Sequence, residues 1–349
     1  MIDDRPSGVL LVGSVPLADA EAVFRAVGST LGDRVRRIPD GETGIRSNWV
    51  GWQAAVFARE AHLEPAAVDS SMGYGNNPRF RVRAGVDRRA IAITGSLGYA
   101  DVARTSYATF VRLRREGAVP RYARFQVCLP SPLAPVRSMI VPEDQGLLVG
   151  PYEARMLAEL AEIVRAIPAA DLAVQWDVAS EFSTLDGTNP PPADRIDGAV
   201  SEITARLVRI GKQVPVGAAL GYHLCYGDYG HRHFREPDDT SWIVRIANTI
   251  ASGLGRPLDW LHFPVPRERS DDRYFAPLSR LRLPSRTEVY VGCVHLSDGA
   301  AGARRRVAAA RKVLADFGVA TECGFGRRPP ETIPGLLDLL REVSAPVAP

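Results

Sequence analysis

Short runs of apolar, mostly β-branched residues alternate along the whole chain with longer stretches of helical periodicity. In residues 19–31 the apolar positions recur three and four apart, which is the spacing of one face of an α-helix. Further helices are predicted over 152–167, 197–210, 241–250, 303–317 and 333–343. The runs predicted as strands cover 8–12, 35–38, 123–128, 172–176, 216–222, 260–263, 289–294 and 319–321.

This alternation of strand and helix is typical of a parallel sheet covered by helices. About eight such units in 349 residues predict a closed (β/α)₈ barrel, or TIM barrel, that forms a single domain over residues 1–349. A doubly wound open sheet is the alternative, but no Gly-x-Gly-x-x-Gly motif follows the first predicted strand. We therefore expect the α/β barrel.

Residues 66–98 do not fit the alternation. The runs 80–83 and 90–93 predict an irregular hairpin, inserted between barrel units two and three. An insertion at this point lies over one end of the barrel. It would serve either as a lid over a site or as a surface decoration, and the sequence pattern fits both.

The composition of the chain indicates which kinds of molecule the protein binds. With 46% hydrophobic and 24% charged residues the chain is an ordinary globular protein, and a net charge of +3 is too small to indicate binding to nucleic acid or to an anionic membrane. No apolar run approaches the roughly 18 residues of a membrane span, and the N-terminus does not resemble a signal peptide. Four cysteines in so long a chain fit reduced thiols. We expect a cytoplasmic protein whose partners are small molecules.

The residues able to bind a metal stand at the ends of apolar runs. His223 and Cys225 follow the run 215–220, and Cys323 follows 319–321. Side chains two apart on an extended segment point the same way, so His223 and Cys225 can share one site. A second thiolate from a neighbouring strand end would complete a nitrogen and sulfur set suited to zinc, with a fourth position open. The same residues also fit two buried thiols and a core histidine.

Active-site residues of a TIM barrel lie just past the carboxyl ends of its strands. At those positions this chain carries hydroxyl, carboxyl, imidazole and thiol groups. They are Ser14, Glu42, Ser131, Asp177, Glu181, His223, Cys225, His295, Asp298 and Cys323. This convergence predicts an active site at that end of the barrel.

Short motifs near these positions resemble, in the same order, those of the catalytic domain of cobalamin-independent methionine synthases, which belong to a barrel superfamily with uroporphyrinogen decarboxylase. The resemblance extends from residue 8 to about residue 343 and covers nearly the whole chain. The motifs are Val-Gly-Ser-Val-Pro (12–16), Gly-Glu (41–42), Leu-Pro-Ser-Pro-Leu (129–133), Gln-Trp-Asp (175–177), Tyr-His-Leu-Cys-Tyr (222–226), Val-His-Leu-Ser (294–297), and Glu-Cys-Gly with Pro-Glu-Thr (322–332).

The resemblance implies a zinc-dependent barrel that binds a small-molecule thiol as thiolate and transfers a methyl or other alkyl group from a donor to its sulfur. It implies His223, Cys225 and Cys323 as the zinc ligands. For the substrate, it implies that Ser14 holds the carboxylate of a homocysteine-like thiol and that Glu42 and Asp177 hold its ammonium. It implies His295 as the proton donor to the leaving group.

The chain departs from the family in two places. The family's fourth metal ligand is a Glu in an Ile-Glu-Thr segment, where Pro264 stands here with His262 close by. No counterpart of the family's folate-contacting tryptophan segment is found, and Trp49 and Trp52 lie on a predicted helix where packing roles fit better. The alkyl donor therefore stays open.

The polar loop after Cys225 adds Asp228, His231 and His233, which would line the pocket, supply a further ligand or belong to a surface loop. Two other functions also stay open. One is a metal-independent decarboxylase or lyase of the uroporphyrinogen decarboxylase type, in which Cys225 and Cys323 would have no role. The other is a non-catalytic barrel that binds zinc or a thiol.

Overall fold

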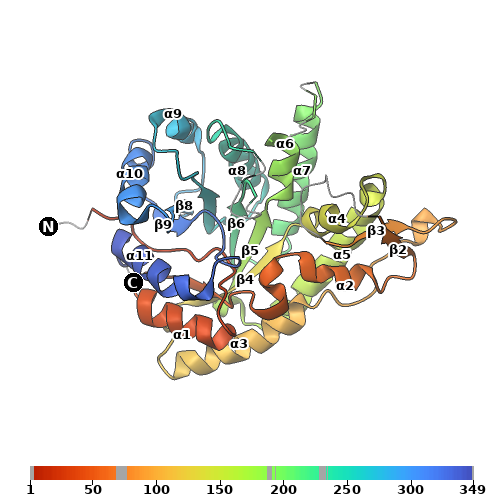
Figure 1. The fold of residues 1–349 in the computed structure, drawn as a ribbon, viewed down its shortest axis with the longest axis horizontal. Coiled ribbons are helices and arrows are strands. Elements are labelled where there is room, and N and C mark those ends of the chain that lie inside the picture. Colours follow the sequence, from red (N-terminus) through yellow and green to blue (C-terminus); the bar gives the residue numbers. More distant parts are fainter. Residues whose placement is uncertain are drawn as a thin grey trace.

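A curled parallel sheet of seven strands forms the centre of the computed structural model (Figure 1). The structure describes residues 4–67, 77–186, 191–192, 194–227, 233 and 235–347. Neighbouring strands follow the order β1-β4-β5-β6-β7-β8-β9. The strands are β1 Arg37–Pro39, β4 Arg124–Pro130, β5 Leu172–Val178, β6 Ala219–Leu224, β7 Trp260–Pro264, β8 Glu288–Val294 and β9 Gly318–Thr321.

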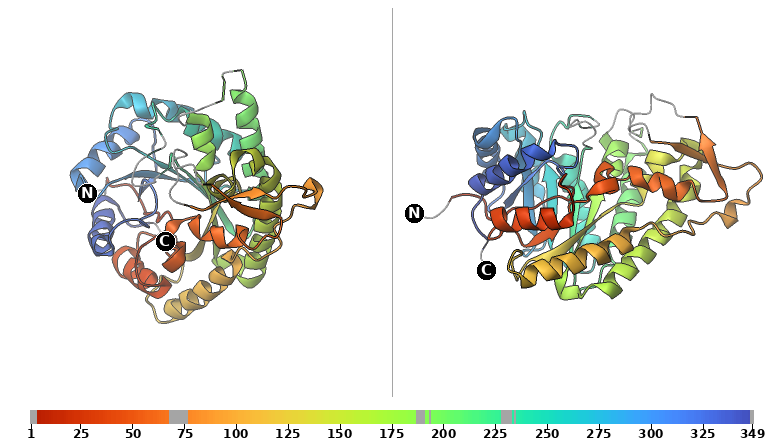
Figure 2. Two further views of the ribbon diagram at one scale, coloured as in Figure 1. Left: turned by 45° about the vertical axis from the view of Figure 1, so that its right-hand side comes forward. Right: turned by 60° about the horizontal axis from the view of Figure 1, so that its bottom comes forward.

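Helices surround the sheet on its outer side (Figure 2). Helix α1 packs against both α3 and the last helix, α11, so the two ends of the chain meet in the outer layer. The longer helices are α1 Ala20–Leu31, α3 Tyr99–Arg115, α5 Pro142–Ala166, α7 Ile196–Gly211, α8 Ser241–Gly253, α10 Gly299–Arg311 and α11 Ile333–Val343. The shorter ones are α2 Ala54–Phe57, α4 Leu133–Met139, α6 Ser180–Asp186 and α9 Asp272–Phe275. None of the helices in the described residues is long and apolar enough to cross a membrane.

The predicted first strand, 8–12, is not a strand of this sheet. It makes an isolated parallel bridge from Val9 to Val319 of β9, and the Val9 amide donates to the carbonyl of Arg34 at 2.8 Å. The segment thus runs between β9 and the chain that leads into β1. The α/β class and the curled, TIM-barrel-like parallel sheet are confirmed, while the count of eight barrel units stays a prediction.

The inserted segment pairs differently from the prediction. β3 (Arg79–Val82) is antiparallel to β2 (Leu63–Ala66), which lies upstream of it, and residues 90–93 form no strand. Ile91 and Ile93 are buried, whereas their neighbours are exposed. The alternation that suggested a strand therefore reflects a loop that packs two side chains on the core without a partner strand. Residues 68–76 lie outside the described residues.

Inside the curl of the sheet a small apolar cluster fills the amino-terminal half of the strands. Its members are Leu10, Val12, Ala173, Ala219, Trp260, Tyr290 and Ala320. Below it the Arg37 guanidinium lies over the Trp260 ring, 4.2 Å from its centroid, and forms an ion pair with Glu288. This packing closes one end of the fold and leaves the carboxyl ends of the strands as the place for a cavity.

Candidate functional site

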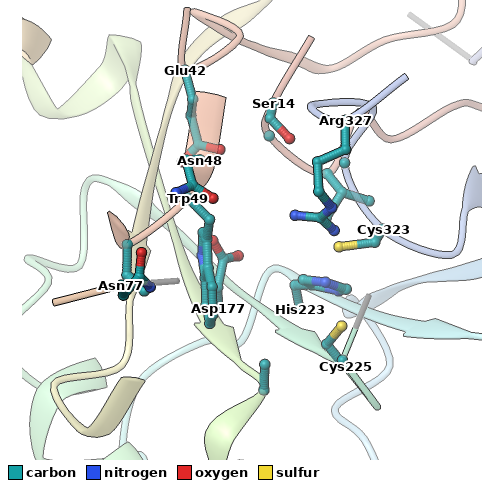
Figure 3. A pocket seen from close by; sticks show the side chains of 16 residues that line it. Ser14, Glu42, Asn48, Trp49, Asn77, Asp177, His223, Cys225, Cys323 and Arg327 are labelled. Atoms are coloured by element: carbon teal, nitrogen blue, oxygen red, sulfur yellow. The ribbon is translucent and has the colours of Figure 1, made fainter. Parts of the chain in front are cut away.

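A cavity of about 190 Å³ lies at the carboxyl ends of the strands (Figure 3). Of the seven side chains to which the motif resemblance assigns a role, six line it, and His295 is the exception. Ser131, Glu181 and Asp298, which also follow strands, do not line it. Its lining consists of Val12, Gly13, Ser14, Glu42, Asn48, Trp49, Val50, Asn77, Asp177, Ala179, His223, Cys225, Gly227, Cys323, Gly324 and Arg327.

Three of these side chains form a group that could hold a metal ion. One ring nitrogen of His223 and the sulfur atoms of Cys225 and Cys323 all lie within 4.8 Å of one another. Figure 3 shows the His223 ring between the two sulfur atoms. His223 is on β6 and Cys323 follows β9, so the curl of the sheet brings together strands that are separated by β7 and β8. The group found among the described residues contains no carboxylate, and Pro264 does not line the cavity.

His262, which the sequence did not identify as a site residue, contacts the first of these ligands. In the parallel pair of β6 and β7 it lies opposite His223, and the two Nδ1 atoms are 2.7 Å apart. Its other nitrogen, Nε2, lies 3.0 Å from the carbonyl oxygen of Thr321 on β9. His262 is fully buried, and burial together with His223 lowers its pKa well below the usual histidine value. Since His262 is fully buried and its two ring nitrogens contact an imidazole and a carbonyl oxygen, its surroundings favour the neutral imidazole.

Two carboxyl groups face the cavity from the opposite side. Burial raises the pKa of Asp177 to about 7, although His223 opposes the shift. Burial likewise raises the pKa of Glu42 to about 8, and the charge of Asp177 adds to this while Arg46 opposes it. Because the negative charge of Asp177 disfavours ionisation of Glu42, a cation beside these groups would favour their charged forms. Gln175 fixes one oxygen of Asp177 by donating from Nε2 at 2.8 Å.

The loop that carries Glu42 is held in a strained conformation. Glu42 and Trp49 have φ angles of 48° and 50°, and within the described ranges they are the non-glycine residues with positive φ. Both line the cavity. Asp40 holds the loop, since it accepts hydrogen bonds from the Glu42 amide at 3.0 Å, from Arg46 at 2.8 Å and from Ser106 at 2.8 Å. Strain of this kind costs about 1–3 kcal/mol per residue and is found preferentially at functional sites.

Trp49 and Arg327 are lining residues to which the sequence assigned no role in the site. Trp49 was expected to pack on a helix, but the helical turns break there, and Trp49 lies beside Asp177, where it opposes the rise in the pKa of that carboxyl. Arg327 points into the cavity (Figure 3), where its charge lowers the pKa of Glu42. The glycines on either side of Trp49, Gly44 and Gly51, were a weak signal in the sequence for an irregular loop.

Ser14 is fixed by the loop after Cys323. Its hydroxyl oxygen accepts from the Gly326 amide at 3.1 Å, and its carbonyl accepts from the Phe325 amide at 2.6 Å. A Cβ atom at Gly324 would lie 2.3 Å from this hydroxyl oxygen, so only glycine permits the close approach. The hydroxyl proton of Ser14 is left as a donor toward the cavity.

His295 lies behind the cavity rather than on its wall. Its Nε2 donates to the carbonyl of Val265 at 2.9 Å, and its Nδ1 is 3.2 Å from Oε2 of Glu322. The other oxygen of Glu322 lies 3.1 Å from Nε2 of His233. Burial lowers the pKa of His295. The role of His295 as a proton donor stays a prediction, and Asp228 and His231 lie outside the described residues.

Comparison with known proteins finds relatives at the level of fold. No protein-family model matches the chain, and no curated protein matches its sequence. A putative vitamin-B12-independent methionine synthase from Listeria monocytogenes superposes with a TM-score of 0.58 at 12% identity, over 98% of this chain and 99% of that one.

Two further solved structures are similar. A B12-independent methionine synthase from Shewanella sp. W3-18-1, in complex with selenomethionine, gives a TM-score of 0.58 at 15% identity over 96% of both chains. A methyltransferase from Methanosarcina mazei gives 0.54 at 11% identity, over 98% of this chain and 94% of that one. The chain therefore has the fold of the proteins that its motifs resemble, over nearly its whole length.

Proposed function

We propose that the protein is a zinc-dependent transferase that moves a methyl or other alkyl group from a small-molecule donor to the sulfur of an amino-acid thiol such as homocysteine. The observation that carries this proposal is the arrangement of one cavity. His223, Cys225 and Cys323 meet on one side of it, and the carboxyl groups of Glu42 and Asp177 face it from the other. The similar solved structures are described as two B12-independent methionine synthases and a methyltransferase, which supports the same activity.

The three-residue group fits zinc better than harder cations. Two sulfur donors and one imidazole nitrogen are soft and borderline ligands, whereas calcium and magnesium prefer oxygen. Three protein ligands leave one position for a substrate sulfur. When bound, zinc lowers the pKa of a coordinated thiol, so that thiolate is present at neutral pH. Pro264 in place of a fourth ligand keeps that position open.

The rest of the cavity suits an amino acid attached to the thiol. Glu42 and Asp177 would accept hydrogen bonds from its ammonium, and a bound cation would restore the charged form of both carboxyls. Ser14 would donate to its carboxylate, and the Arg327 guanidinium adds a positive charge on the same wall. These groups would hold the substrate with its sulfur directed at the metal ligands.

His295 is proposed as the proton donor to the leaving group. Glu322 would stabilise its protonated form through Nδ1, and Nε2 would have to leave the Val265 carbonyl and turn toward the cavity. We also propose that the chain forms one barrel domain and that the segment 66–98 covers the site. Asn77 from that segment lines the cavity, which supports a covering role over a surface decoration.

The test combines metal content with turnover. Purified protein should contain about one zinc per chain, measured by plasma mass spectrometry, and each of Cys225→Ser and Cys323→Ser should lower it. Cys293→Ala is the matched control, because Cys293 is a fully buried thiol of the outer core. Homocysteine should be methylated when methyl-tetrahydrofolate, methylcobalamin or a methylsulfonium donor is supplied. Zinc that is unaffected by both Ser variants would overturn the ligand assignment, and full turnover of the zinc-free protein would favour the metal-independent class.

A further inference from the structure

We infer that His262 is a positioning residue that holds the proton of His223 on Nδ1 and so presents the bare Nε2 of His223 to the two cysteine sulfurs. The inference rests on the proposed function only in giving Nε2 a metal to bind. The protonation pattern itself follows from hydrogen bonds within the protein, and it can be tested without metal.

The assignment of the ring protons starts from the contact between His262 and the carbonyl of Thr321. A carbonyl oxygen only accepts, so the nitrogen of His262 that lies 3.0 Å from it, Nε2, must carry a hydrogen. A neutral imidazole has a single N–H group, so Nδ1 of His262 is left as an acceptor. The contact of 2.7 Å between the two Nδ1 atoms then needs a hydrogen on Nδ1 of His223. His223 in turn has one N–H group, and its lone pair is therefore on Nε2.

This arrangement reverses the ordinary preference of a neutral histidine for which ring nitrogen carries the proton. A neutral histidine in water holds its proton mainly on Nε2, and that proton would have to leave before a metal could bind there. With Nδ1 of His223 engaged by His262, Nε2 is the nitrogen left to share the site with the sulfurs of Cys225 and Cys323. Orientation of a ligand histidine through its second nitrogen is a general way to increase metal affinity.

His262 also ties together the two parts of the chain that carry the ligands. It contacts His223 on β6 and Thr321 on β9, and the Thr321 hydroxyl donates to the carbonyl of Cys323 at 2.6 Å. Gly292 on β8 leaves room for this link. A Cβ atom there would lie 2.9 Å from Nε2 of His262 and 2.8 Å from the Thr321 oxygen. The separation of the two ligand-bearing strands is thereby set before any metal arrives.

The experiment uses metal-free protein with ¹⁵N-labelled histidine and long-range proton–nitrogen correlation spectra. We expect His223 to show a protonated Nδ1 and an unprotonated Nε2, and His262 the opposite pattern. In His262→Leu, which can neither donate nor accept, His223 should change to the Nε2-protonated form or to a mixture. His262→Gln should restore the native pattern, because its amide can donate to Thr321 and accept from His223.

Zinc affinity, measured by competition with a chromophoric chelator, gives the second readout. We expect about a 10–100-fold loss in His262→Leu, a smaller loss in His262→Gln, and none in Cys293→Ala. A metal-free wild-type protein with the His223 proton on Nε2 would overturn the inference, whether or not any variant folds. So would wild-type zinc affinity in a folded His262→Leu. The expected proton pattern in a protein that binds no zinc would support the inference and contradict the proposed function instead.

Discussion

Asp177 and His223 occupy equivalent positions on adjacent parallel strands, each opposite the other in the register of β5 and β6. The carboxylate proposed to bind the substrate is thus one strand away from the imidazole proposed to bind a metal. The spacing of neighbouring strands, about 4.8 Å, sets the distance between these two functions. The loops after the strands add Cys225, Glu42 and Cys323 around this rigid pair.

Replacing Asp177 by Asn should weaken the binding of homocysteine by roughly 1–3 kcal/mol, because the ammonium loses a charged hydrogen-bond partner. Isothermal titration calorimetry on the zinc-loaded protein would measure the change. A thiol of the same length that lacks the amino group is the matched control, and its affinity should stay the same. Equal losses for both thiols would place Asp177 at the metal rather than at the ammonium.

The stability of the metal-free protein should fall as the pH rises from about 4 to about 8 and should level off above that. The pKa values of Asp177, about 7, and Glu42, about 8, are higher than those of the same groups in an unfolded chain, about 3.9 and 4.3. The folded protein therefore binds these protons more tightly. The stability they contribute is fully present below the unfolded-state pKa values, falls as the pH rises above them, and is lost once the pH has passed the two folded-state values. Urea denaturation at several pH values would measure this slope.

The double variant Glu42→Gln/Asp177→Asn provides the control for this pH dependence. Neither amide titrates, so the decline in unfolding free energy between about pH 4 and about pH 8 should become shallower. An unchanged slope in the double variant would mean that other groups cause it.

Asp40→Ala should loosen the strained Glu42 loop while leaving the metal ligands in place. The variant removes the acceptor of three hydrogen bonds, and we expect the free energy of unfolding to fall by roughly 1–3 kcal/mol. Homocysteine binding should weaken with it, since Glu42 would no longer be held in position. Zinc content should match that of the wild-type protein, and zinc loss in a folded Asp40→Ala would show that the loop and the metal group are not separate.

X-ray absorption at the zinc edge should show two sulfur ligands, one nitrogen and one oxygen before substrate is added. The reason is that His223, Cys225 and Cys323 supply three ligands and leave one position for water. Addition of homocysteine should replace the oxygen by a third sulfur. A shell of four protein ligands before thiol is added would contradict this prediction and point to a further ligand in the chain.

Gly292→Ala should disturb the site without altering any side chain that touches the cavity. The new methyl group would lie 2.9 Å from Nε2 of His262 and force the bond to Thr321 to lengthen. Overpacking of this kind costs about 1–3 kcal/mol, and zinc affinity should fall together with stability. Thermal unfolding and chelator competition would follow the two effects. Wild-type zinc affinity in a destabilised Gly292→Ala would separate packing from metal binding.

The parts of the fold and site that the sequence predicted depend on residues that are close together in the chain. Apolar runs located the seven strands of the sheet to within a few residues, and polar residues just after them located most of the cavity wall. At β6 the predicted start was early, because Val216 is 73% exposed in a turn that precedes Ala219.

What the sequence did not predict depends on neighbours that are distant in the chain. In the sequence, His262 is a single polar residue within an apolar strand. Only the register of β6 against β7 shows that it contacts His223. Trp49 fits a helical pattern until its positive φ interrupts the helical turns. The segment 90–93, which was predicted as one strand of the hairpin, has a strand-like alternation of apolar residues. Its buried side chains pack on the core, but the segment forms no strand.

The plug formed by Arg37 and Trp260 at the amino-terminal end of the sheet has a kinetic consequence. With the apolar cluster above it, the plug closes the amino-terminal end of the described sheet, so in the proposed transferase both reactants would reach the cavity from the carboxyl ends of the strands. If the proposed function holds, the thiol would have to reach His223 and the two cysteines before an alkyl donor occupies the path behind it. Turnover should therefore follow a compulsory order in which the thiol is the first substrate to enter and the alkylated product the last to leave.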